Sequence, residues 1–142
     1  MSSTRCLMFL AFVLFSLGCG KKNTAIVWPE LQALDHAAES AEAKVKAGAD
    51  AAQLAALAAD LADKSGKLLA SPVPAGVKSP DLVNLRLREI KDLHAALADP
   101  SVLTPSHLLA FHPVVAALLD AAGMPHVHED DHDHDHDHDH AH

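Results

Sequence analysis

The sequence predicts an all-α protein, an antiparallel up-down-up-down four-helix bundle. Three observations lead to this fold class: apolar residues recur every three or four positions in four segments between residues 29 and 123, turn-forming residues separate the segments, and no stretch alternates with the period of a β-strand. Because the connections are short, successive helices should run antiparallel. The four segments suffice for one hydrophobic core, so a single domain is expected.

The first helix is expected from about Pro29 to Ala47, because Gly48 is a typical C-terminal glycine. The second should begin after Asp50, which forms the pattern of a capping box with Gln53 three residues later. A proline-rich segment then separates the two halves of the bundle. The expected inward-facing positions are Leu31, Leu34, Ala38, Ala41 and Val45 in the first helix, and Leu54, Leu57, Leu61, Ser65 and Leu68 in the second.

The third helix is expected to begin at the Ser-Pro pair 79–80, where serine can cap and proline suits the first turn. The fourth should begin in the same way at the Thr-Pro pair 104–105 and end at Gly123. Pro113 lies inside it and has no N–H to donate, so this helix should be kinked at Pro113 or split into two. The expected inward positions are Val83, Leu87, Ile90, His94 and Leu97, then Leu108, His112, Val115, Leu119 and Ala122.

The N-terminus has the layout of an export signal, in which a single arginine precedes an apolar run over residues 6–17. The run is too short and wrongly flanked for a membrane-spanning helix. It ends in FSLGC, which resembles the lipobox of bacterial lipoproteins and implies cleavage after Gly18 and lipidation of Cys19. Cys6 would leave with the signal, so no disulfide and no thiolate metal site are expected. Gly20 stands where aspartate favours inner-membrane retention, which implies an outer-membrane anchor facing the periplasm in a Gram-negative host.

The acidity of the chain is concentrated at its C-terminus. The formal net charge is −8, and seven of the nineteen acidic residues lie in the range 129–139. The remainder of the mature chain is close to neutral, and nothing in it points to nucleic acid. From residue 126 onward the chain has eight histidines and almost nothing apolar, so the tail 124–142 is expected to be disordered when free.

This tail has the composition of a metal-binding segment, because imidazole is a common ligand of zinc, nickel and copper and carboxylates can complete the shell. Binding should weaken as the pH falls through about 6.5, since the ligand must be neutral imidazole. The same titration would suit a pH-sensitive or solubilising segment, and an expression tag is the third reading. The candidate ligands are His126, His128, His132, His134, His136, His138, His140 and His142.

The helices show no catalytic constellation: the sequence has no Gly-x-Ser-x-Gly elbow, no phosphate loop and no His-Glu-x-x-His motif, so no enzymatic activity is expected. His94 and His112 occupy inward positions at similar heights, with His107 nearby. They form a possible second metal site, or they are core-edge histidines that bond to the backbone or to each other. No carboxylate is expected at an adjacent inward position. His36 is expected off the apolar stripe of the first helix.

These observations divide the chain into a signal peptide (1–18), a lipid-anchored linker (19–28), an alanine-rich bundle (29–123) and the tail (124–142). The layout resembles small bacterial lipoproteins with histidine-rich termini. The expected function is non-catalytic sequestration or handling of divalent transition metals, with the membrane and a metal transporter or another envelope protein as partners. Anchor and tail should leave the same end of the bundle. The alternative is a structural or adaptor bundle that binds an envelope partner, with the tail acting only as a pH-sensitive or solubilising segment.

Overall fold

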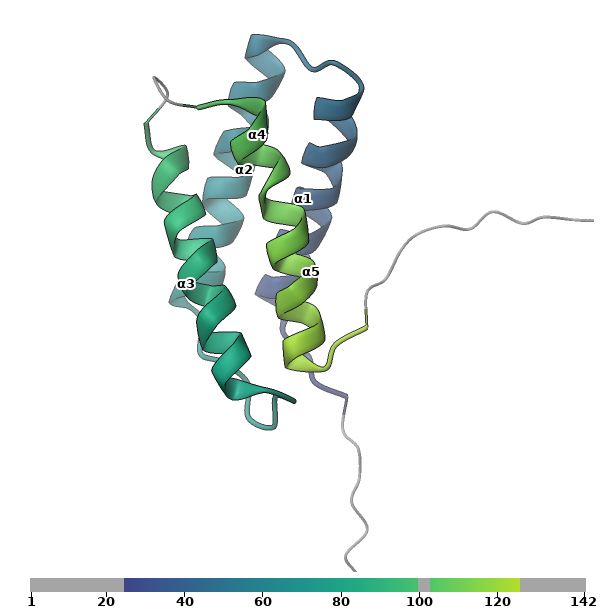
Figure 1. Ribbon diagram of the computed structural model, residues 1–142, viewed down its shortest axis with the longest axis vertical. Coiled ribbons are helices and arrows are strands. Elements are labelled where there is room, and N and C mark those ends of the chain that lie inside the picture. Colours follow the sequence, from purple (N-terminus) through teal and green to yellow (C-terminus); the bar gives the residue numbers. More distant parts are fainter. Residues whose placement is uncertain (1–24, 100–102, 126–142) are drawn as a thin grey trace, which may run out of the picture.

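The computed structural model describes residues 25–99 and 103–125, and this part of the chain is entirely helical, without strands (Figure 1). Its helices are α1 (Pro29–Lys46), α2 (Ala51–Ala70), α3 (Pro80–Leu97), α4 (Pro105–Leu109) and α5 (Phe111–Ala122). The predicted all-α four-helix bundle is confirmed, with α4 and α5 together forming the fourth arm. The signal peptide, Cys19 and all eight histidines of the tail lie outside the described residues.

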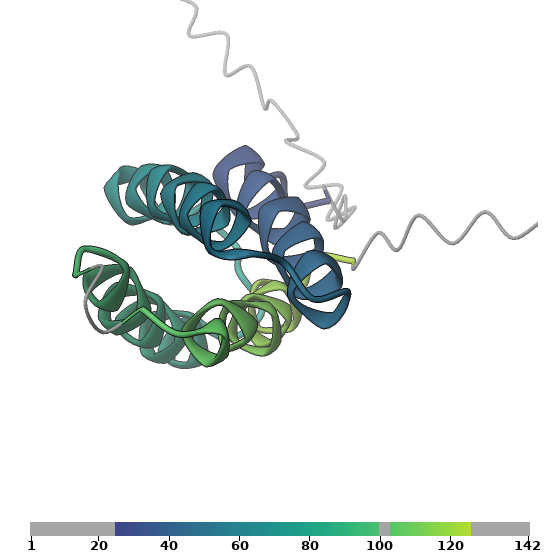
Figure 2. The same ribbon diagram turned by 90° about the horizontal axis from the view of Figure 1, so that it is seen from above.

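The four arms surround one core. Helix α1 packs against α2 and α5, and α3 packs against the other sides of α2 and α5, while α4 continues the contact with α1. Figure 2 shows the pair α1 and α2 facing α3 and the α4–α5 arm. The chain runs up and down alternately, so the described part begins and ends at the same end of the bundle (Figure 1). None of the described helices is both long enough and apolar enough to cross a membrane.

Helix α2 begins with the capping hydrogen bonds that its sequence predicts. The backbone N–H of Gln53 donates to Oδ1 of Asp50 at 2.8 Å, and the backbone N–H of Asp50 donates to Oε1 of Gln53 at 2.9 Å, which is the predicted capping box. At α3 the cap differs from the prediction, because the Ser79 side chain makes no capping hydrogen bond. Instead, the backbone N–H of Ser79 donates to the carbonyl of Ala121 at 2.9 Å, which ties the start of α3 to the end of α5.

The fourth arm is split into two helices, which is one of the two alternatives predicted from Pro113. The interruption lies at Ala110, three residues before Pro113. Proline cannot donate to the carbonyl of Leu109, and its ring crowds that carbonyl, so the helix opens ahead of the proline. Pro113 itself lies in the first turn of α5, where an amide N–H has no partner within the helix.

The core includes residues on both sides of the range 29–123, which the sequence assigned to the bundle. Trp28, assigned by sequence to the linker, is only 1% exposed, and its indole N–H donates to Oγ of Ser71 at 2.9 Å. Met124, assigned to the tail, is also buried. The largest fully buried side chains besides Trp28 are Phe111, Leu31, Leu34, Leu61, Leu68, Ile90, Leu108, Leu118 and Leu119.

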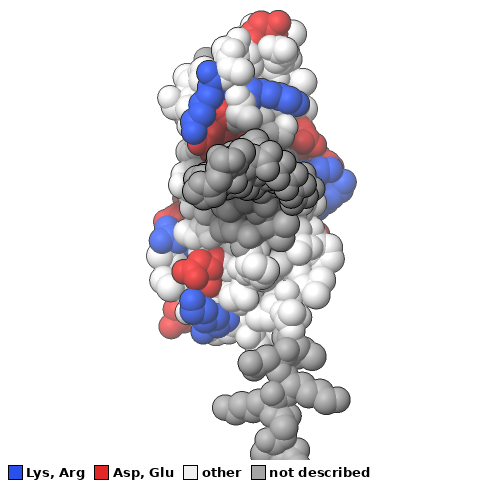
Figure 3. Space-filling view, turned by 90° about the vertical axis from the view of Figure 1, so that its right-hand side faces the viewer, with Lys and Arg blue, Asp and Glu red and all other residues white. Residues whose placement is uncertain are grey.

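Acidic and basic side chains are mixed on the surface. On the described part of the face in Figure 3, neither sign forms an extended patch. Several of these charges are paired: Lys67 lies 2.8 Å from a carboxylate oxygen of Asp63, and Lys78 lies 3.1 Å from one of Asp120. Exposed pairs of this kind contribute little to stability, so the bundle depends mainly on its apolar core.

Two glycines allow a direct test of how the helices end. Gly123 has φ +80° and Gly48 has φ +88°, a left-handed conformation that costs other residues about 1–2 kcal/mol. A Cβ at Gly123 would also lie 3.2 Å from Cβ of Lys78, whereas nothing lies within 4 Å of a Cβ at Gly48. Gly123→Ala should therefore lower the free energy of unfolding more than Gly48→Ala. Urea unfolding of the two variants measures the difference, and equal losses would contradict the proposed crowding.

Candidate functional site

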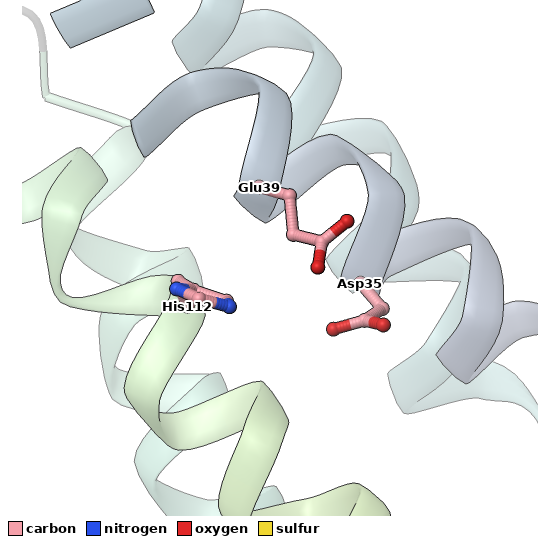
Figure 4. A group of neighbouring side chains, drawn as sticks. All are labelled: Asp35, Glu39 and His112. Atoms are coloured by element: carbon pink, nitrogen blue, oxygen red, sulfur yellow. The ribbon is translucent and has the colours of Figure 1, made fainter. Parts of the chain in front are cut away.

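Three potential metal ligands come together between α1 and α5. Asp35 and Glu39 lie one turn apart on the same face of α1, and His112 in the first turn of α5 lies opposite them (Figure 4). Each of the three offers one ligand atom, and these atoms all lie within 4.8 Å of one another. We call these three residues the α1–α5 group. Within the described residues it is the single set of three or more acidic, histidine or cysteine side chains with such spacing.

The packing of α1 explains why a carboxylate is buried there. Helix α1 contacts α2 on one side and α4 with α5 on another, so its buried face is wider than its stripe of leucine and alanine. Asp35 follows Leu34 directly and is 5% exposed. Glu39, one turn further along, and His112 are both half-buried. The group thus combines a buried carboxylate with two side chains that water can still reach.

Glu42 extends the line of acids along α1 and contacts the histidine from the other side. It forms an ion pair with Lys46, and its carboxylate also contacts Nδ1 of His112. The hydrogen bond from Lys46 is the main reason that the pKa of Glu42 lies below its usual value. Burial acts against this effect, and the contact with His112 acts in the same direction as Lys46. Glu42 is therefore a carboxylate at neutral pH.

The other histidines that the sequence singled out have different neighbours. Nδ1 of His94 lies 2.8 Å from Oγ of Ser65 on α2. Nδ1 of His107 accepts a hydrogen bond from the backbone N–H of Thr104 at 3.2 Å, which caps α4. Among the described residues, the structure thus places His112 in a group with metal-ligand spacing but includes neither His94 nor His107 in it. His94 is half-buried, but its partner is a serine side chain and not the backbone or His112, which the non-metal interpretation expected.

The two carboxylates of the group were missed from the sequence. The expectation that no carboxylate lies beside an inward histidine is wrong for His112, because Asp35 is buried and Glu39 is half-buried next to it. The available signal was the spacing of Asp35, Glu39 and Glu42, which places three acids on one helix face. His36 is exposed, as expected.

The ligand types and spacing of the α1–α5 group can be compared with those of a zinc site. A zinc ion with ligands at about 2.0–2.1 Å requires ligand atoms roughly 3.4 Å apart in tetrahedral geometry. The ligand atoms of the α1–α5 group lie within 4.8 Å of one another and would have to approach by up to about 1.4 Å to reach that spacing. Three protein ligands would leave a further position for water or for an exchanging ligand.

Comparison with known proteins adds no relative: no family model matches the chain, and no curated protein or solved structure is found to be similar to it. The likeness to bacterial lipoproteins therefore stays a prediction from the N-terminal segment and the tail.

Proposed function

We propose that this protein binds divalent transition-metal ions without catalysing a reaction, as a lipid-anchored envelope protein that sequesters metal or passes it on. The observation that carries the proposal is the α1–α5 group, in which one imidazole and two carboxylates from two helices have metal-ligand spacing. Imidazole suits zinc, copper and nickel, and carboxylate oxygens complete the shell of such borderline ions.

The charges around the α1–α5 group favour a divalent cation. Asp35, Glu39 and Glu42 provide three carboxylates along one face of α1, and Lys46 provides one positive charge beside Glu42. A buried carboxylate such as Asp35 is normally paired or bound to a cation, because an isolated charge is costly to bury.

The sequence supports the same function at both ends of the chain. The lipobox at Cys19 and the histidine-rich tail lie outside the described residues and contribute by composition alone. The described chain begins and ends at one end of the bundle (Figure 1). An anchor and a tail that continue from this end would hold metal ligands near the membrane, where a metal transporter could accept the ion.

Removing residues 126–142 should abolish most metal binding and leave the bundle intact. The described core lies between Ile26 and Met124, so the deletion removes none of its residues. Calorimetric titration with zinc at neutral pH should give several equivalents per full chain and one equivalent per shortened chain. At a pH well below about 6.5 the additional equivalents should disappear, because the tail imidazoles are then protonated.

A matched control replaces the eight tail histidines by asparagine and keeps the length of the tail. It should bind zinc like the shortened chain. Full stoichiometry after either change would contradict metal binding by the tail, and complete loss would contradict a site in the bundle.

The adaptor function is the second candidate, and one observation favours it. Leu82 and Leu85 lie one turn apart on α3 and are 49% and 39% exposed, so they present two large apolar side chains on the same helix face. Such a pair could contact an envelope partner. A chain without residues 126–142 that keeps normal metal tolerance in the cell would favour this alternative.

A further inference from the structure

We infer that Glu42 is a positioning residue, which orients His112 so that its Nε2 binds a zinc-type ion together with Asp35 and Glu39. This inference rests on the proposed metal binding at the α1–α5 group. It goes further by assigning the ligand atom of the histidine and by giving a role to an acid outside the group.

The first step concerns the hydrogen on the imidazole ring. Glu42 forms an ion pair with Lys46, and an ionised carboxylate can only accept hydrogen bonds. The contact between Glu42 and Nδ1 of His112 therefore requires the hydrogen to be on Nδ1. In the neutral ring the lone pair is then on Nε2, which is the form of histidine that binds a metal.

The second step concerns the direction of Nε2. Along α1, Glu42 lies beyond Glu39, and Asp35 lies one turn before it. Since Glu42 contacts Nδ1, an ion held jointly with Asp35 and Glu39 would have to bind Nε2. Figure 4 shows one ring nitrogen of His112 directed toward the carboxylates of Asp35 and Glu39. With an ion on Nε2, the three groups would form a carboxylate–histidine–metal arrangement, in which the carboxylate fixes the tautomer and raises the basicity of the ligand.

The third step concerns the kind of ion. One imidazole nitrogen and two carboxylate oxygens suit a borderline divalent ion, which zinc represents, better than the all-oxygen shells of magnesium or calcium. The ligands come from α1 and α5, so a bound ion would join the first arm of the bundle to the interrupted fourth arm. Metal binding at this group should therefore also stabilise the fold.

The test uses the chain with its eight tail histidines replaced by asparagine, so that only the bundle can bind zinc tightly. Zinc affinity is measured by competition with a chromophoric chelator, and the tautomer of His112 by long-range ¹H–¹⁵N correlation. Glu42→Ala removes the acceptor, so zinc should bind about 10- to 100-fold more weakly and the ring should shift from the Nδ1–H to the Nε2–H tautomer. Glu42→Gln keeps an acceptor oxygen and should retain the Nδ1–H tautomer with a smaller loss of affinity.

A matched control, Asp92→Asn, removes one exposed negative charge on α3 and should leave both readouts unchanged. If the parent chain binds zinc but Glu42→Ala changes neither the affinity nor the tautomer, the role of Glu42 is overturned and the proposed function stands. Should Glu42→Ala fail to fold, unchanged zinc affinity in Glu42→Gln overturns it. A parent chain that binds no zinc, with His112 resonances unmoved by the ion, instead overturns the metal site itself.

Discussion

Replacing Trp28 by alanine is expected to lower the free energy of unfolding by about 3–5 kcal/mol, the range for removing a large aromatic side chain from a core. The indole is 1% exposed and is the largest side chain among the fully buried residues. Its N–H also donates to Oγ of Ser71, which connects the start of α1 to the end of α2. Chemical denaturation followed by circular dichroism measures the loss.

Two further variants separate the causes of this effect. Trp28→Phe keeps most of the apolar volume and loses the hydrogen bond to Ser71, so it should cost about 1 kcal/mol beyond any repacking. Val27→Ala changes a neighbour that is 66% exposed and should alter stability by less than about 0.5 kcal/mol. If Trp28→Ala costs no more than Val27→Ala, then residue 28 belongs to the linker, as the sequence suggested.

The helices were predictable because each depends on local chemistry. Asp50 and Gln53 specify the start of α2 through hydrogen bonds within one turn, and Gly123 ends α5 in the left-handed conformation. The inward positions also follow from spacing: Leu61 and Leu68 on α2, predicted as core, are fully buried. The burial of Trp28 did not follow from spacing, because this residue precedes the first helix and has no periodic neighbour on its N-terminal side.

The position of the break in the fourth arm shows the limit of reasoning from a single residue. Pro113 predicts an interruption, but its effect falls on the carbonyl four residues earlier, so the helix opens at Ala110. The consequence for the site is direct. His112 lies in the first turn of a new helix, and its ring contacts Glu42 of α1.

The candidate site was only partly predictable, because it depends on which arms are neighbours. The sequence identified His112 as an inward residue, but paired it with His94 on the adjacent arm. In the structure His94 bonds to Ser65 of α2, and His112 faces α1. Asp35 lies beside the apolar stripe, and it is buried because α1 packs against two neighbours. Such widening of a buried face follows from tertiary packing, which helical periodicity alone does not report.

The substitution Asp35→Asn is expected to remove most of the stabilisation that bound zinc would give to the bundle. In the chain with asparagine in place of the tail histidines, zinc at 100 times its dissociation constant should add about 2.7 kcal/mol to the free energy of unfolding. Asp35→Asn keeps the size of the side chain and removes the charged ligand. A 100-fold loss of affinity would leave about 0.4 kcal/mol at the same zinc concentration. Thermal or urea unfolding with and without zinc measures both gains.

Controls for this experiment separate metal binding from packing. The metal-free stability of Asp35→Asn, measured with a chelator present, shows any change in the fold itself, because only the difference between zinc and chelator reports the site. Glu39→Gln should reduce the zinc gain in parallel, since Glu39 belongs to the same group. Asp92→Asn should retain the full gain because it lies on α3, outside the group. A zinc gain that survives in the double variant Asp35→Asn/Glu39→Gln would place the ion elsewhere, because the α1–α5 group would then keep His112 as its single ligand.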